Sequence, residues 1–379
     1  MKLADRIERV PPSGIRRYFD LAAEAEDVIS LGVGEPDFTT PWSAREAAIS
    51  SLERGRTSYT PNRGLRDLRE AIARRESDKR GLDYDPDEEI LVTTGASEAI
   101  DLAFRALIDP GDTVAIAQPS YVSYPPSAIF AGGEVLSVPT RAEEEFVLTR
   151  EALEASGAAD ASVLVLCYPN NPTGATMTEG ELAPIADFCR EHDLAVISDE
   201  IYADLTYDRE HASIATLPGM GERTIVVNGF SKAYAMTGLR LGYALAPPEA
   251  SAAMTRVHQY TMLSAPTTAQ HAAIDALRNC EADLREMNSQ YDRRRRYARS
   301  RFVEMGIECF EATGAFYLFP EAPGGDAEAF ARTLLEEAGV AVVPGDVFGE
   351  GGAGHLRVSY ATGLPDLREA LDRIEAVLE

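Results

Sequence analysis

Short runs of aliphatic and β-branched residues alternate with helical patterns through most of this chain, and this alternation is the feature that most constrains its fold. The runs that predict buried strands lie at residues 90–94, 113–117, 162–167, 194–199 and 224–227. Such alternation is typical of an α/β protein whose mostly parallel sheet is covered by helices on both faces. Ligands bind such sheets in the loops at the carboxyl ends of the strands, so we expect a functional site there.

The last third of the chain has a different pattern. Helical periodicity dominates from about residue 248 to Met305, and strand patterns return at residues 314–320, 340–345 and 355–360. The closing helix has one apolar face, formed by Leu367, Leu371, Ile374 and Leu378. We therefore predict a large domain at residues 49–282 and a smaller α/β domain formed by residues 1–48 and 283–379, although no linker composition marks the boundary.

Lysine is almost absent from this chain: Lys2, Lys79 and Lys232 are the only three among 36 basic residues. Lys232 follows a predicted buried strand and lies among small and apolar residues. Desolvation there would lower the pKa of its amine and free it to attack a carbonyl and form a Schiff base. The alternative is a lysine that extends from a strand end into solvent, and this stretch alone favours neither.

The segment at residues 95–104 turns from a predicted strand directly into a helix, and its first residues are small. Open N–H groups at such a helix start, with the positive end of the helix dipole behind them, would bind an anion. Ser97 also fits an ordinary helix cap, and caps are much commoner than phosphate sites. The local residues therefore favour the cap.

Further loops with polar or aromatic residues follow the predicted strands, at residues 119–124, 168–174 and 199–202. Taken singly, they are also consistent with an aromatic-bearing loop, a Pro-Gly turn and an acidic strand end. Gly32 and Gly34 permit close approach of the backbone to a ligand, but alone they indicate only a turn. The three loops and the Lys232 loop fall at the same end of successive strands, which favours one common site.

The charge balance bears on partners and location. The 62 acidic residues outnumber the 36 basic ones and give a net charge of −26, which would repel nucleic acid and anionic membranes, so we predict neither as a partner. The acid excess and the scarcity of lysine suggest a halophilic protein of a salt-rich cytoplasm. The charged amino terminus lacks a signal peptide's apolar core, and no apolar run reaches membrane-spanning length, so we expect a cytoplasmic protein.

Other patterns favour structural interpretations. The basic run at residues 293–296 lies in a helical pattern, and we interpret it as a solvated helix face. The four cysteines lack CxxC spacing and predict reduced core thiols, and the five histidines lack ligand spacing, so no metal site is predicted. The GxGxxG match at residues 349–354 precedes a strand and opens no helix, so we reject it as a dinucleotide site.

Several blocks taken together resemble the class I/II aminotransferases, which are pyridoxal-phosphate enzymes of fold type I. The resemblance runs from about residue 10 to the end of the chain, with every block in the family's order. The blocks are Gly34-Glu35-Pro36-Asp37, Tyr59-Thr60-Pro61, Gly95-Ala96-Ser97-Glu98-Ala99, Asn170-Asn171-Pro172-Thr173-Gly174, Ser198-Asp199-Glu200-Ile201-Tyr202, Ser231-Lys232 with Arg240, and Arg357-Val358-Ser359-Tyr360. The resemblance implies a large domain with a mostly parallel seven-stranded sheet between helices, a smaller α/β domain, and pyridoxal 5'-phosphate as the cofactor.

The resemblance also implies roles around the cofactor ring. Lys232 would form the Schiff base and, once displaced by the substrate amine, would move the proton between the substrate and the cofactor. Asp199 would keep the ring nitrogen protonated, because a nearby carboxylate favours the cationic form and makes the ring an electron sink. Tyr202 and Asn171 would hydrogen-bond the ring hydroxyl. Tyr121 would stack on the ring and line the substrate position.

The implied phosphate site lies at the helix start, where the backbone of Ala96 and Ser97 would meet the phosphate, with Arg240 and Ser231 adding charge and donors. Tyr59 would reach the phosphate of the neighbouring subunit, which makes a homodimer the expected active unit.

The substrate carboxylate would form a bidentate pair with Arg357, with Asn171 and the Gly34 backbone alongside. Arg357 taken alone is also consistent with an ordinary charge at a sheet edge. Its place in the family's order of blocks is what favours a role in binding the substrate.

The implied reaction is a ping-pong transamination, in which an amino acid leaves as a 2-oxo acid and a second oxo acid, expected to be 2-oxoglutarate, takes the nitrogen. Residues 120–124 and 314–317 resemble archaeal members that act on aspartate, aromatic or broad neutral amino acids. Glu98 occupies the helix start where some aspartate-specific relatives have lysine, and it would repel a second carboxylate if it faced the pocket. A carbon-sulfur lyase of the same fold is the alternative. A non-catalytic regulator is disfavoured because no catalytic position is missing.

Overall fold

The computed structural model describes residues 2–15 and 27–379, and its centre is a seven-stranded sheet. The strand order is β2-β8-β7-β6-β5-β3-β4, and β8 runs antiparallel to both of its neighbours while the other pairs are parallel. The strands are β2 (Ile90–Thr93), β3 (Thr113–Gln118), β4 (Glu134–Pro139), β5 (Val163–Cys167), β6 (Ala195–Asp199), β7 (Thr224–Gly229) and β8 (Gly242–Leu245). The predicted α/β fold and mostly parallel sheet are confirmed, whereas β4 and β8 were not predicted from the local pattern.

Helices cover both faces of this sheet, because successive residues of each strand point to opposite sides. In β3, Val114 and Ile116 enter one core and Ala115 and Ala117 enter the other. The first core is closed by α5 (Ala96–Leu107), α6 (Tyr124–Ala131) and α9 (Pro248–Thr261). The opposite face is covered by α4 (Arg66–Arg80), α7 (Arg150–Ser156), α8 (Glu179–Glu191) and α10 (Thr267–Asn279), and α3 (Trp42–Glu53) packs on the outside of α10. This layering leaves the strand ends free to carry loops.

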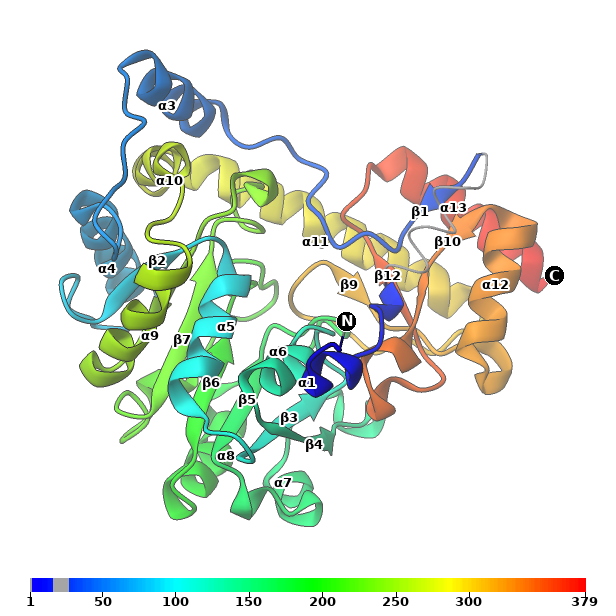
Figure 1. The fold of residues 1–379 in the computed structure, drawn as a ribbon. Helices are drawn as coiled ribbons and strands as arrows, with labels where there is room; N and C mark the ends of the chain where they lie inside the picture. The colour runs from blue at the N-terminus through cyan, green and yellow to red at the C-terminus, as the bar shows by residue number, and fades with distance from the viewer. Residues whose placement is uncertain (1, 16–26) are drawn as a thin grey trace.

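Two smaller sheets lie beside the main sheet (Figure 1). In them β1 (Ile29–Ser30) pairs with β10 (Val340–Ala341), and β12 (Leu356–Ser359) lies between β11 (Val343–Pro344) and β9 (Tyr317–Leu318). They pack with α11 (Glu281–Glu304), α12 (Ala327–Ala338) and α13 (Leu364–Leu378). The strand pattern predicted at 340–345 therefore holds two short strands, because the residues on either side of Val342 pair in different sheets.

The remaining helices are short. α1 (Asp5–Glu8) lies near the edge strand β4, to which Arg9 is joined by an ion pair with Glu134. Single turns of 3-10 helix occupy Ala142–Glu144, Ala158–Asp160, Ile214–Thr216, Thr237–Leu239, Pro323–Gly325, Gly345–Phe348 and Glu350–Gly352.

The basic run at 293–296 is not the solvated helix face that we predicted. Arg295 is 1% exposed and pairs with Asp208, and the buried Arg294 pairs with Asp37. Four consecutive helical positions point around the whole helix axis rather than along one face. Two of the four therefore turn inward, where acidic partners compensate their charge.

All four cysteines are free and buried, which confirms the predicted core thiols. A Cβ on Gly351, inside the GxGxxG match, would lie 2.7 Å from the Gln118 carbonyl oxygen, so this glycine permits close packing against the sheet. Over residues 2–15 and 27–379, no His, Cys, Asp and Glu side chains gather in a group that could hold a metal ion, and no helix has the length and apolar character needed to cross a membrane.

Candidate active site

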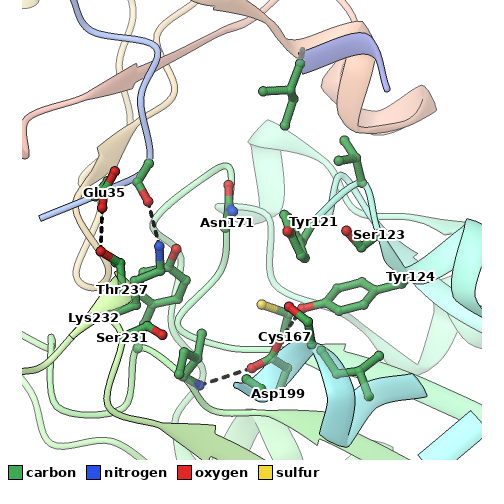
Figure 2. A pocket seen from close by; sticks show the side chains of 18 of the residues that line it. Glu35, Tyr121, Ser123, Tyr124, Cys167, Asn171, Asp199, Ser231, Lys232 and Thr237 are labelled. Carbon is green, nitrogen blue, oxygen red and sulfur yellow. Dashed lines mark hydrogen bonds between the residues drawn. The ribbon is translucent and has the colours of Figure 1, made fainter. Parts of the chain in front are cut away.

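A pocket of about 490 Å³ lies at the carboxyl ends of the parallel strands (Figure 2). Its walls come from the loops that follow β2, β3, β5, β6 and β7, together with the segment after β1 and residues of the smaller sheets. The predicted site residues that line it are Gly34, Ala96, Ser97, Tyr121, Asn171, Asp199, Tyr202, Ser231, Lys232, Arg240 and Arg357. Tyr59 does not line this pocket, and its side chain is 81% exposed.

Lys232 follows β7 and extends into this pocket rather than into bulk solvent (Figure 2). Its Nζ donates a hydrogen bond to the carbonyl oxygen of Gly34 at 2.6 Å and lies 5.6 Å from the ring centroid of Phe316. Burial of the amine, with a smaller effect from the positive charge of Arg357, lowers the pKa of Lys232 to about 8. The sequence left two interpretations open, and this geometry favours the reactive amine.

Asp199 ends β6 and is 4% exposed. The Tyr124 hydroxyl donates to its Oδ2 at 2.7 Å, and the backbone N–H of Ile201 donates to its Oδ1 at 3.1 Å. Burial raises the pKa of Asp199 to about 6 even though both donors favour the ionised form. A buried carboxylate with two fixed donors is suited to stabilising a cation placed beside it.

Arg357 on β12 is buried, with 2% exposure, and its guanidinium lies 4.7 Å from the ring centroid of Tyr317. It donates to Asn171 Oδ1 at 2.9 Å and to the carbonyl oxygen of Gly32 at 2.6 Å. The Gly34 carbonyl, two residues further along, accepts from Lys232 Nζ. In the described part of the chain Nε has no hydrogen-bond partner and no carboxylate pairs with this arginine, which leaves it suited to an anionic ligand.

The turn from β2 into α5 forms a cradle that fits a phosphate. Gly95 has a φ of 78°, and a Cβ there would lie 2.8 Å from Nη2 of Arg240, so the guanidinium lies against this turn. A Cβ on Gly242 would lie 2.4 Å from the backbone nitrogen of Ala96. The first N–H groups of α5 have no intrahelical partner. Since α5 begins at Ala96 and Gly95 is its cap residue, the interpretation of Ser97 as the cap is wrong, and the donor set fits an anion.

Glu98 turns away from the pocket. Its Oε2 accepts a hydrogen bond from the Thr94 N–H at 2.5 Å, and its Oε1 lies 2.6 Å from Nδ1 of His258. Its carboxylate therefore does not meet a bound substrate, and the argument that it would repel a second substrate carboxylate does not apply.

Some pocket residues were not assigned from the sequence. The Tyr317 hydroxyl lies 2.9 Å from the Tyr202 hydroxyl, and Thr237 donates to Glu35 across the pocket mouth. Together with Tyr124, these residues lie within or next to the quoted blocks, but nothing in their local pattern indicated which side chains they meet.

The comparisons with known proteins agree with this geometry. Residues 26–374 match the model of the family described as aminotransferase class I and II. The chain is 45% identical over 383 residues to an aspartate aminotransferase of Pyrococcus abyssi, covering 100% of this chain and 98% of that one. It is 44% identical to aromatic-amino-acid aminotransferase 2 of Thermococcus litoralis, with 100% and 99% covered. The solved aspartate aminotransferase of Thermus thermophilus with maleate superposes with a TM-score of 0.95 at 39% identity, with 100% of both chains covered.

Proposed function

This chain belongs to the class I and II aminotransferases, which are pyridoxal-phosphate enzymes, and we propose that its pocket at the strand ends is where it transfers the amino group. When bound, pyridoxal phosphate carries the amino group between the two substrates and draws electrons from the reacting carbon. One observation carries the proposal: Lys232, with its pKa lowered to about 8, and the buried Asp199 line the same pocket.

Lys232 would hold the cofactor through its amine, which condenses with the aldehyde with loss of water, and, once displaced by the substrate amine, would move the α-proton of the substrate. Its lowered pKa supports both tasks, because a neutral amine attacks a carbonyl and accepts a proton. The Gly34 carbonyl and the ring of Phe316 restrict where the amine can lie, which supports a fixed direction of proton transfer.

Asp199 holds the proton on the cofactor's ring nitrogen. The donors from Tyr124 and Ile201 keep the carboxylate oriented, and a neighbouring cation would favour its ionised form. Tyr202 and Asn171 bond the ring hydroxyl, and Tyr121 stacks on the ring face; their support is that all three line the same pocket.

The cofactor phosphate binds to the start of α5. The backbone at Ala96 and Ser97 supplies N–H donors, and Ser231 and Arg240 supply a hydroxyl and a positive charge. The support is the position of Arg240. Its guanidinium lies so close to the turn that a Cβ on Gly95 would have no space.

The substrate carboxylate binds to Arg357, with Asn171 and the Gly34 backbone alongside. The buried guanidinium with an unpaired Nε is the support, since a bidentate carboxylate would satisfy it.

The amino donor is aspartate, an aromatic amino acid or a broad range of neutral amino acids, and the acceptor is 2-oxoglutarate. Relatives with about equal identity to this chain are named for aspartate and for aromatic donors, and Glu98 faces away from the substrate and so favours neither. The names of the relatives do not favour a carbon-sulfur lyase.

A panel of amino donors assayed with 2-oxoglutarate tests the function, with the wild type and the Arg357→Ala variant measured in parallel. We expect glutamate to form from at least one donor of the proposed classes, and the variant to raise the KM for every donor by about 100-fold, since charged hydrogen bonds contribute about 1.5–3 kcal/mol. Its affinity for pyridoxal phosphate should change little. Equal losses of donor and cofactor affinity would contradict the role of Arg357, and release of pyruvate and ammonia from cystathionine would indicate the lyase.

We also propose a homodimer in which Tyr59 of one subunit reaches the phosphate of the other. Tyr59, Trp42 and Tyr260 are exposed by 81%, 60% and 85%, so these large side chains are free to meet a partner subunit. A sedimentation experiment that finds a single chain at working concentration would contradict the dimer.

The remaining proposals concern the whole chain. We divide the chain into a large domain, residues 49–282, and a smaller one, residues 1–48 with 283–379. The pocket supports this division, because Gly34 and Arg357 line it from the smaller domain and the other predicted residues line it from the larger one. The net charge of −26 supports a halophilic protein that works in a salt-rich cytoplasm.

A further inference from the structure

A buried acid–histidine pair lies behind the start of α5. Glu98 is on the first turn of this helix, and His258 is on α9, which packs against it. The exposed fractions of their side chains are 11% for Glu98 and 0% for His258, and Oε1 lies 2.6 Å from Nδ1. Neither residue lines the pocket.

Glu98 fixes the turn that leads into the helix. Its second oxygen accepts the N–H of Thr94 at 2.5 Å, so the side chain reaches back past the cap residue Gly95. The Gly95 carbonyl accepts from the Thr93 hydroxyl at 2.9 Å and from the Glu98 N–H at 3.2 Å. With these groups held from inside the protein, the N–H groups of Ala96 and Ser97 remain as the donors of the cradle.

His258 fixes Glu98 in turn. The carboxylate of Glu98 is largely removed from water. Its Oε2 accepts from Thr94, and Nδ1 of His258 is the polar partner of its Oε1. Over the described residues Nε2 has no hydrogen-bond partner, so Glu98 is the polar contact that orients this ring. Buried pairs of this kind are seldom net stabilising, and one of their known uses is to specify a single arrangement.

We propose that Glu98 and His258 are positioning residues of the phosphate site, which hold the turn at residues 94–96 so that its N–H groups and Arg240 meet the cofactor phosphate together. The inference rests on the proposed placement of that phosphate at Ala96 and Ser97. Because the pair acts on the cradle alone, it affects recognition of the phosphate and not of the pyridine ring.

The test compares the dissociation constants of pyridoxal phosphate and pyridoxal for the full-length protein freed of cofactor, measured by equilibrium fluorescence. The main variant is the double substitution Glu98→Met with His258→Leu. Replacing both polar partners by apolar groups of similar size removes the acceptor of Thr94 without leaving a buried charge, so the protein is expected to fold.

Three further variants make the comparison specific. His258→Gln alone keeps a donor within reach of Glu98. Met254→Ala removes buried volume one turn earlier on α9 and controls for loss of packing. Arg240→Met removes a proposed phosphate ligand and tests the placement of the phosphate itself.

We expect the double variant to reduce the preference for pyridoxal phosphate over pyridoxal by about tenfold, the effect of losing one positioning hydrogen bond. His258→Gln, which leaves Glu98 in place, should keep most of the preference. Met254→Ala should lower thermal stability without changing the preference. If Arg240→Met reduces the preference and the double variant does not, the pair has no positioning role. If neither variant changes it, the phosphate lies elsewhere and the proposed site is wrong. An equal loss for both ligands, shared by Met254→Ala, would show a purely structural role and overturn the inference.

Discussion

Lys232 and Asp199 have pKa values shifted toward each other, to about 8 and about 6, and burial is the chief cause of both shifts. Burial penalises the charged form of each side chain, so the amine loses its proton more easily and the carboxyl keeps its proton longer. The amine of Lys232 is therefore within reach of neutrality near physiological pH, as proton transfer requires, while Asp199, with a pKa of about 6, remains mostly ionised there and can stabilise a cation.

The first prediction concerns the titration of Lys232. In the cofactor-free protein, modification of Lys232 by an amine-specific reagent should rise with a midpoint near pH 8, because that is its shifted pKa. Quantitative peptide mass spectrometry measures it, with Lys2 and Lys79 as internal references. The folded pKa lies below the ordinary lysine value of 10.5, so the folded state binds this proton less tightly than the unfolded state, and stability should rise with pH from about 8 to 10.5. A midpoint close to 10.5 would show a solvated amine.

At this scale the sequence predicted the unusual lysine but not its neighbours. Desolvation of Lys232 followed from the apolar residues around it, and the roles of the other site residues came from the resemblance. The hydrogen bond from Tyr124 to Asp199 and the contact between Glu98 and His258 each join residues far apart in the chain. No local sequence pattern encodes such contacts.

The phosphate cradle depends on how three elements meet. β8 runs antiparallel between β2 and β7, and this brings Gly242 against the first residue of α5. The close approach is possible because Gly242 has no side chain. The shape of the cradle is therefore a property of strand order as well as of the turn.

The second prediction follows from this contact. Gly242→Ala should weaken pyridoxal phosphate binding by tenfold or more and lower thermal stability, since its Cβ would lie 2.4 Å from the Ala96 nitrogen, a backbone atom that cannot move aside without shifting the helix. Fluorescence titration and thermal unfolding measure the two effects. Gly238→Ala is the matched control, because a Cβ there meets nothing within 4 Å. Equal behaviour of the two variants would show that the contact is unimportant.

Strand and helix periodicity predicted the central strands, but β4 and β8 required the structure. β4 is an edge strand with mostly half-buried residues, so it lacks the continuous apolar run that marks a central strand. β8 has four residues and no β-branched side chain. The order of strands in the sheet is likewise absent from any local pattern, since pairing is between distant segments.

The net charge of −26 acts on the whole molecule. Self-repulsion among exposed carboxylates opposes the compact state, and salt screens it once the Debye length falls below the charge spacing, to about 3 Å at about 1 M. Some surface carboxylates are already neutralised by arginines, as the half-exposed Asp208 is by the buried Arg295, so the repulsion comes from the unpaired acidic side chains.

The third prediction is a rise of several degrees in the thermal unfolding midpoint between low and high potassium chloride. Circular dichroism measures the midpoint, and sucrose at matched osmolality is the control for effects that do not depend on charge. An unchanged midpoint and unchanged activity after dialysis to low salt would contradict the halophilic proposal.

The most direct test of the central claim is to locate the covalent bond to the cofactor. The holoenzyme is reduced with borohydride, digested and mapped by mass spectrometry, with Lys232→Ala treated in parallel. The account predicts a phosphopyridoxyl group on Lys232, and none on Lys2 or Lys79 in either protein. A phosphopyridoxyl group on another residue, or an unlabelled Lys232 in a holoenzyme that retains its visible absorbance, would contradict it.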